Sequence, residues 1–196
     1  MKQLILGLAL MMALPAMATS SLQQTIKEAS DKLLDEMKFN AEAYKDDPQK
    51  IYELVDTVVL PHFDFEAMTD LALGHYSDQV SPEQRPEIIN EFRQLLVRTY
   101  SSALLEYTDQ SVVFLPTEGS EADGEVTVRA EIQQAGGFPI PIDYLFHNGA
   151  DGWKVIDVSV DDVSLVTNYR SSFARAIKKE GVDGLIQTLR DRNQSQ

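Results

Sequence analysis

The chain of 196 residues contains no cysteine and only three histidines. Without cysteine it can form no disulfide, no thiolate metal site and no cysteine nucleophile. His62, His75 and His147 do not follow HExxH or a similar ligand spacing, so no metal site is expected. The sequence also lacks a GxSxG nucleophile motif and a glycine-rich phosphate loop. The usual signatures of hydrolases, nucleotide-binding proteins and metalloenzymes are therefore missing.

Basic residues are scarce as well. The chain has 17 Lys and Arg against 31 Asp and Glu, which gives a net charge of −14. Nucleic acids are bound largely through Lys and Arg contacts to phosphate, so no nucleic-acid partner is expected. The same negative charge is repelled by anionic lipid surfaces, so a docking protein would have to bring the chain to a membrane.

Long apolar runs are limited to the N-terminus. The run Leu4–Leu14 follows Lys2 and precedes Ala16-Met17-Ala18. It is too short to span a bilayer, and these three parts predict a secretory signal peptide over 1–18. Export without disulfides favours a bacterial periplasmic location. The remaining chain suits one domain over 19–192, followed by a disordered tail over 193–196.

The first two-thirds of this domain has the 3.6-residue period of amphipathic helices. Asp64 is expected to cap a short helix that ends at Gly74. Ser81-Pro82-Glu83-Gln84 has the capping-box pattern and starts the longest helix, whose apolar stripe runs from Ile88 to Tyr107. In chain order, the predicted helices cover 20–37, 47–60, 65–73 and 81–107.

Beyond residue 110 the apolar residues alternate with period two, which indicates strands. Strands are predicted over 111–115, 125–133, 138–147 and 153–160. Pro139 and Pro141 favour an edge position for the third strand, because proline donates no ladder hydrogen bond. A last helix is predicted from Asp161-Asp162, with an interruption at Gly181. Helices followed by a four-stranded, mainly antiparallel sheet and a closing helix make an α+β domain.

One face of the strand 138–147 is strongly apolar, with Ile140, Ile142, Tyr144 and Phe146 in alternate positions. Ordinary packing of helices onto a sheet explains such a face. Aromatic and methionine side chains also collect near the expected rims of the sheet, and residues of these types line ligand cavities well. The sequence therefore leaves both a solid core and a ligand pocket open.

Acid–base residues offer a weaker alternative. His62 and Asp64 are close in sequence, and Asp143 and Asp157 lie on adjacent predicted strands. Asp64 is expected to be a helix cap, and the other two carboxylates alternate with the apolar face, so they are expected to face outward. No catalytic residue is predicted. An enzyme would need Asp143, Asp157 or His62 inside the cavity.

Three segments together resemble one family. They are LPHFDFEAMTDLALGHY at 60–76, SPEQRPEIINEFRQLLVRTYSSAL at 81–104, and GWKVIDVSVDDVSLVTNYRSSFARAI with GVDGLIQTL over 152–189. Their order and combination resemble the MlaC, or toluene-tolerance, family of periplasmic phospholipid-binding proteins of Gram-negative bacteria. The likeness covers nearly the whole domain.

The resemblance implies a fold like nuclear transport factor 2, with a curved sheet against helices and a deep apolar pocket. It implies a monomeric, non-enzymatic carrier of phospholipid, which is cargo and not a cofactor. The expected partners are an outer-membrane lipoprotein–porin complex and an inner-membrane ABC transporter complex. The alternatives are a ketosteroid-isomerase-like enzyme on the same fold, or an interaction module with a solid core.

The residues expected to line the pocket come from the apolar sheet face and from the helix stripes that would cover it. Arg98 and Arg170 are expected at the pocket mouth as contacts for the lipid phosphate, with a structural ion pair as the alternative. The expected lining consists of Val58, Phe63, Phe65, Met68, Leu96, Tyr100, Val128, Ile142, Tyr144, Val158, Val160, Leu165, Tyr169 and Phe173.

Overall fold

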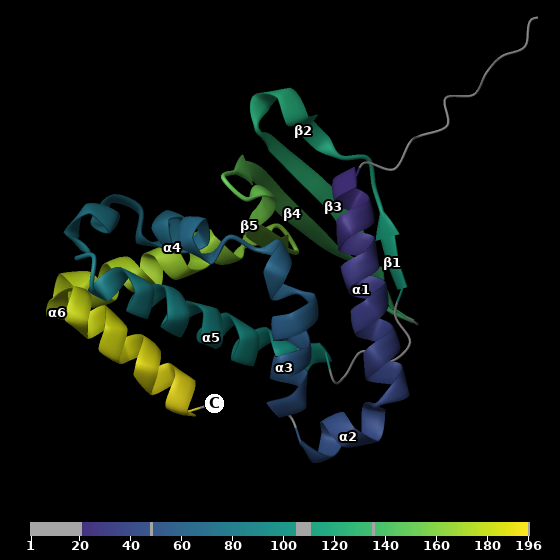
Figure 1. The fold of residues 1–196 in the computed structure, drawn as a ribbon, viewed down its shortest axis with the longest axis horizontal. Coiled ribbons are helices and arrows are strands. Elements are labelled where there is room, and N and C mark those ends of the chain that lie inside the picture. Colours follow the sequence, from purple (N-terminus) through teal and green to yellow (C-terminus); the bar gives the residue numbers. More distant parts are fainter. Residues whose placement is uncertain (1–20, 48, 105–110, 135, 196) are drawn as a thin grey trace, which may run out of the picture.

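A computed structural model describes residues 21–47, 49–104, 111–134 and 136–195. The predicted signal peptide and Tyr107 lie outside the described residues. The fold is α+β: one sheet, a long helix that lies across it, and a block of helices to one side (Figure 1). This confirms the predicted class, whereas the likeness to nuclear transport factor 2 stays a prediction.

The helices follow the predicted stripes closely, with differences at their ends. Four further short elements, α2 and the 3-10 turns η1, η2 and η3, were not predicted. In chain order, the helical elements are α1 (Ser21–Phe39), α2 (Ala41–Asp46), α3 (Gln49–Val58), η1 (Leu60–His62), α4 (Phe65–Leu73), η2 (Gly74–Gln79), α5 (Gln84–Leu104), η3 (Glu121–Asp123) and α6 (Leu165–Ser195).

The sheet has six strands, two more than predicted. The added strands β2 and β6 have three and two residues, which is too short for an alternating pattern to reveal them. The order is β1-β3-β4-β5-β6, β2 also pairs with β3, and every pairing is antiparallel. The strands are β1 (Ser111–Phe114), β2 (Glu118–Ser120), β3 (Glu125–Gln133), β4 (Ile140–Gly149), β5 (Gly152–Val160) and β6 (Val163–Ser164).

The predicted edge position of the strand 138–147 is wrong, because β4 pairs with β3 and β5 and lies inside the sheet. Its prolines are tolerated for a local reason. Pro139 precedes the strand, and Pro141 lies beyond the last paired residue of the β4–β5 ladder, where its carbonyl accepts the amide of Asp161 at 3.0 Å. Proline therefore interrupts no central pair.

The β4–β5 pairing contains a register shift beside Leu145 and Phe146. Val155 pairs with Phe146 and Asp157 pairs with Leu145, so Ile156 is the extra residue of a bulge. Regular alternation along this strand predicts that Ile156, Val158 and Val160 share one face, and the bulge makes this prediction wrong for Ile156. Val155 joins the apolar cluster with Val158 and Val160, and Ile156 does not.

The sequence pattern also misplaces the start and end of the closing helix. Asp161 and Asp162 have positive φ values of 54° and 63°, and they make the turn between β5 and β6 instead of starting the helix. The helix begins at Leu165 and continues to Ser195, so the predicted tail at 193–195 is helical. Gly181, with φ 72°, divides α6 into two helices as predicted.

The segment from Pro61 to Asp64 joins the helices to the sheet. Strand β6 covers only the end of β5, which leaves the beginning of β5 with a free edge. Phe63 forms a parallel bridge with Val155 on that edge, and the Asp64 amide donates to the Val155 carbonyl at 2.9 Å. The Asp64 carboxylate accepts from the Ala67 amide at 2.9 Å, and its other oxygen lies 2.9 Å from Nε2 of His147.

We expect Asp64→Ala to lower the free energy of unfolding by about 1 to 2 kcal/mol, because it removes the cap of α4 and the partner of His147. Urea denaturation followed by circular dichroism measures the change. Asp151→Ala, in the exposed turn between β4 and β5, is the matched control and should stay within about 0.5 kcal/mol. Equal effects of the two substitutions would contradict the junction role of Asp64.

Candidate functional site

The apolar core of the protein is divided into three clusters. One lies on the inner face of the sheet beneath the first half of α1, a second lies among α4, α5 and α6, and a third joins α1, α2, α3 and Val97 of α5. A domain of this size usually has one contiguous core with smaller satellites. Here Phe63 is the only described residue that packs against both the sheet cluster and the α4–α5–α6 cluster.

The structure brings seven of the predicted lining residues together in the sheet cluster. Register explains the grouping, because Val128 and Val158 both pair with Tyr144, and Val160 pairs with Ile142. Five side chains of this group are only half-buried, although they belong to the cluster on the inner face. The seven are Phe63, Val128, Ile142, Tyr144, Val158, Val160 and Leu165.

Tyr144 combines depth with accessibility. Its deep position raises the pKa of the phenol to about 12, yet the side chain is only half-buried. The hydroxyl has no hydrogen-bond partner among the described residues. The Tyr144 phenol is therefore the polar group among the apolar side chains of this cluster.

Five further predicted residues pack in the cluster of α4, α5 and α6. Met68 and Phe173 are each 1% exposed, and Phe173 and Tyr169 stack edge-on against Phe92 at 5.1 Å. These contacts give the predicted residues of this cluster a packing role. The five are Phe65, Met68, Leu96, Tyr169 and Phe173.

The remaining two predicted lining residues lie apart from each other. Val58 is buried in the third cluster, away from the sheet. Tyr100 is 38% exposed, and the pKa of its phenol is raised by burial and by the neighbouring Tyr169. Tyr100 therefore lies at a rim of the α4–α5–α6 cluster, partly open to solvent.

Arg98 and Arg170 do not converge on one predicted mouth. Arg98 donates to the Asn193 carbonyl at 2.7 Å and lies over the Tyr52 ring at 5.9 Å, where α3 and α5 meet. Nε of Arg170 donates to the Leu71 carbonyl at 2.8 Å, beside α4. The head-group role of both residues stays a prediction.

The sequence pattern missed several members of the sheet cluster. Leu22 and Ile26 of α1 are each 4% exposed and cover the inner face of the sheet, while Phe114 and Trp153 pack at its border. Their apolar character was visible in the sequence. The sequence did not reveal which residues they contact. The placement of α1 over the sheet is set by contacts between residues far apart in the sequence, such as the 2.7 Å hydrogen bond from Gln23 to the Leu115 carbonyl.

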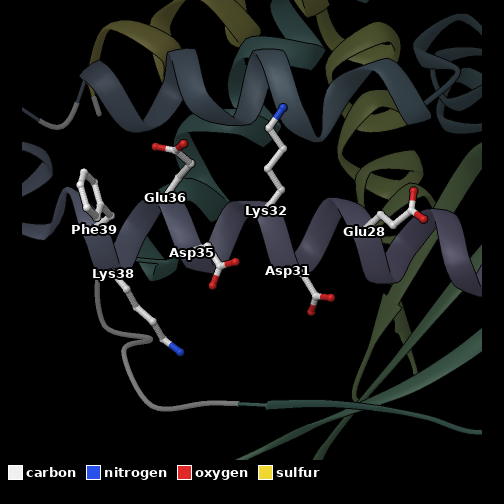
Figure 2. Close-up of a pocket in the computed structure, with 7 residues that line it drawn as sticks. All are labelled: Glu28, Asp31, Lys32, Asp35, Glu36, Lys38 and Phe39. Atoms are coloured by element: carbon white, nitrogen blue, oxygen red, sulfur yellow. The ribbon is translucent and has the colours of Figure 1, made fainter.

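A wide hollow in the described surface lies elsewhere, beside α1. It has a volume of about 970 Å³ and is lined by six charged side chains and Phe39. Figure 2 shows Asp31, Asp35 and Lys38 on one side of the helix, and Lys32 and Glu36 on the other. Charged groups lose hydration when an apolar ligand covers them, so this hollow does not suit acyl chains.

The acid–base candidates are engaged in structural contacts. Asp143 lies 3.5 Å from Nε of Arg129 on the outer face of the sheet. Asp157 accepts from the amides of Val158 and Val166, which fixes the start of α6. Asp64 caps α4 as predicted. The geometry brings no pair of these carboxylates together.

The described residues contain no group of three or more His, Cys, Asp or Glu side chains that could hold a metal ion. Within the same part of the chain, every helix is too short or too polar to cross a membrane. The inner face of the sheet is therefore the candidate site for an apolar ligand. It combines apolar residues with the hydroxyl of Tyr144.

Comparison with known proteins identifies relatives of this architecture. The sequence model of the family described as MlaC protein matches residues 27–191. A toluene tolerance protein, ttg2D, from Pseudomonas putida is 26% identical over 90% of this chain and 83% of its own length. The intermembrane phospholipid transport system binding protein MlaC of Haemophilus influenzae is 28% identical over 87% of this chain and 81% of its own.

A solved structure supports the fold directly. The phospholipid-binding protein from Ralstonia solanacearum, in complex with a phospholipid, superposes with a TM-score of 0.82. It is 34% identical to this chain, and the match covers 90% of this chain and 98% of that one.

His62, in the segment from Pro61 to Asp64 that joins the helices to the sheet, makes the stability of the protein depend on pH. Burial, followed by the charge of Lys154, lowers the pKa of His62 below its ordinary value of 6.5. The unfolded chain then binds a proton more readily than the folded chain, so stability is lost as the pH falls from 7.5 through 6.5 towards the folded pKa. We expect His62→Gln to lose less thermal stability than the parent between pH 7.5 and pH 5.5.

The control for this prediction is His75→Gln, which removes an exposed imidazole. It should keep the pH dependence of the parent in differential scanning calorimetry. A His62→Gln protein with the unchanged pH dependence of the parent would disprove the role assigned to the half-buried imidazole of His62.

Proposed function

Because this chain belongs to the MlaC protein family, we propose that it is a periplasmic carrier that binds a phospholipid by its acyl chains. The observation that carries the proposal is the divided core. The sheet cluster and the α4–α5–α6 cluster share only Phe63 among the described residues. Acyl chains placed between them would supply the apolar contacts that a single core would otherwise make.

The chemistry of the sheet face supports such cargo. Ile142, Tyr144 and Val160 are half-buried without cargo, so a ligand that covers them removes further apolar surface from water. Each buried methylene contributes about 0.8 kcal/mol, and roughly thirty methylenes would contribute on the order of 20 kcal/mol before the costs of ordering and of leaving the membrane. Affinity of this kind needs no reaction and no catalytic residue.

The names of the relatives support the same class of ligand. One relative is a phospholipid transport binding protein, and a solved relative holds a phospholipid. We infer that this chain is exported by its predicted signal peptide and passes phospholipid between a complex in the outer membrane and an ABC transporter complex in the inner membrane. The ketosteroid-isomerase alternative would need Asp143, Asp157 or His62 as an acid–base group. The first two have structural partners, and no observation favours the enzyme.

The first test is the mass of the protein under non-denaturing conditions. We expect the mature chain, purified from a bacterial host without added lipid, to carry a discrete excess mass that organic solvent releases as phospholipid. The amount of bound lipid also reports how many acyl chains are held. A ligand-free mass after gentle handling would favour the solid-core interaction module instead.

Charge on the sheet face should expel the cargo. We expect Tyr144→Asp and Val158→Asp to lose most of their bound phospholipid while keeping helical circular dichroism, because an ionised carboxylate is costly to bury beside acyl chains. Val163→Asp is the matched control, since Val163 lies on the short strand β6 and is 57% exposed. Full retention of lipid by both sheet-face variants would remove the assignment of the pocket to this face.

A further inference from the structure

A second hollow lies where α3 meets α5, on the helical side of the molecule (Figure 1). Its volume is about 320 Å³, and no residue of the sheet lines it. Among the described residues, its lining is almost entirely polar, and Val97 is the only aliphatic member. The other lining residues are Gln49, Tyr52, Glu53, Asp56, Asn90, Arg93, Gln94 and Arg98.

The two arginines of this hollow are in different situations. Arg93 forms an ion pair with Asp56 at 2.7 Å, so its charge is matched. Arg98 has no carboxylate within ion-pair distance in the described part of the chain. It is held by neutral partners, the Asn193 carbonyl at 2.7 Å and the Tyr52 ring at 5.9 Å.

Arg98 differs from the other arginines that lack a carboxylate partner in the described structure. Arg170, Arg175 and Arg192 are exposed, so water satisfies their charge, whereas Arg98 is half-buried. A guanidinium has five N–H donors, and the described contacts use one of those of Arg98. Arg98 is therefore held in place by its neighbours but has no carboxylate partner among the described residues. Although the chain has a net charge of −14, this half-buried cation is available to an anion.

The neighbours of Arg98 favour a carboxylate over a phosphate. Glu53 and Asp56 line the same hollow, and their charges oppose a dianion more strongly than a monoanion. The side-chain amides of Gln49, Asn90 and Gln94 make no hydrogen bond to any described residue, so they can add neutral donors. A carboxylate also fits the fork of a guanidinium with two parallel hydrogen bonds.

The openness of the hollow favours a protein as the source of that carboxylate. Sites for small ligands enclose most of the ligand surface, whereas this hollow is open and its central arginine is half-buried. When an acidic side chain on a protein surface docks, the surface around it covers the open hollow. Tyrosine and arginine, present here as Tyr52 and Arg98, are also the residue types enriched at the energetic centres of protein interfaces.

We propose that the hollow between α3 and α5 is a docking site for an acidic side chain of a partner protein, with Arg98 as the residue that pairs with its carboxylate. The site is separate from the sheet face, so a partner can bind while the protein holds phospholipid. The proposal stands on the contacts of Arg98 and is independent of the carrier function.

The probe for this site is a blocked hexaglutamate peptide, added to the purified full-length mature protein at about 0.15 M ionic strength, where remote charges are screened. We expect a saturable shift of the Arg98 Nε–Hε signal in nuclear magnetic resonance spectra. Acetate, as a free carboxylate, should bind more than tenfold more weakly than the peptide. The six carboxylates of the peptide would by themselves account for only about a sixfold difference.

Variants separate docking from structure. Arg98→Gln should weaken peptide binding at least about tenfold, because a charge-assisted, forked contact is lost. Arg98→Lys keeps the charge and a donor for the Asn193 carbonyl, and should still weaken binding severalfold because it lacks the fork. Arg175→Gln, in an exposed position of α6, is the matched control and should bind the peptide like the parent. All three should keep the helical circular dichroism of the parent.

Four results would overturn the proposal. They are an Arg98 signal that does not saturate with the peptide, equal affinity per carboxylate for acetate and peptide, tighter binding of inorganic phosphate than of the peptide, and equal losses in the Arg98→Gln and Arg175→Gln proteins. The mass measurement tests the carrier function by itself, so failure of one proposal is distinguishable from failure of the other.

Discussion

The structure depends on one short junction, where Phe63 and Asp64 fasten the helices to the free edge of β5. The backbone of this segment satisfies the Val155 carbonyl, which an open sheet edge would leave to water or to another strand. The Asp64 carboxylate holds the first turn of α4 and the imidazole of His147 on β4. The Lys154 ammonium adds a contact of 2.6 Å to the Pro61 carbonyl. These polar contacts around Phe63 help to orient α4 relative to the sheet, as the Asp157 carboxylate does for the start of α6.

This arrangement explains how the protein can keep its fold with a divided core. If the two apolar clusters were fused, their contact would hold the helices and the sheet together, and no space would remain for cargo. With the junction in place, Phe63 touches both clusters at one end, and the remaining apolar surfaces need not meet. The half-buried Ile142, Tyr144 and Val160 are the consequence on the sheet side. A carrier of long acyl chains needs this separation, because the ligand must enter without unfolding the domain.

The sequence predicted elements better than it predicted their neighbours. Capping by Asp64 and the stripe of α5 are local signals, and both were confirmed by the structure. The interior position of β4 was missed because its prolines were judged by frequency, whereas their effect depends on where the neighbouring ladder ends. The same limit applies to the site. Met68 and Tyr144 are equally plausible lining residues by pattern, but one is 1% exposed and the other is half-buried, and only the tertiary packing distinguishes them.

The distribution of charge bears on how cargo would be exchanged. Four of the arginines pair with carboxylates of the chain itself: Arg85 with Asp70, Arg93 with Asp56, Arg129 with Glu118, and Arg190 with Glu87. The net charge of −14 opposes approach to an anionic membrane surface. A carrier with such a surface gains little from direct collision with lipid bilayers. The proposed carrier would therefore exchange its cargo through protein partners, because a protein can offer both an electrostatic match for the surface and an apolar path for the acyl chains.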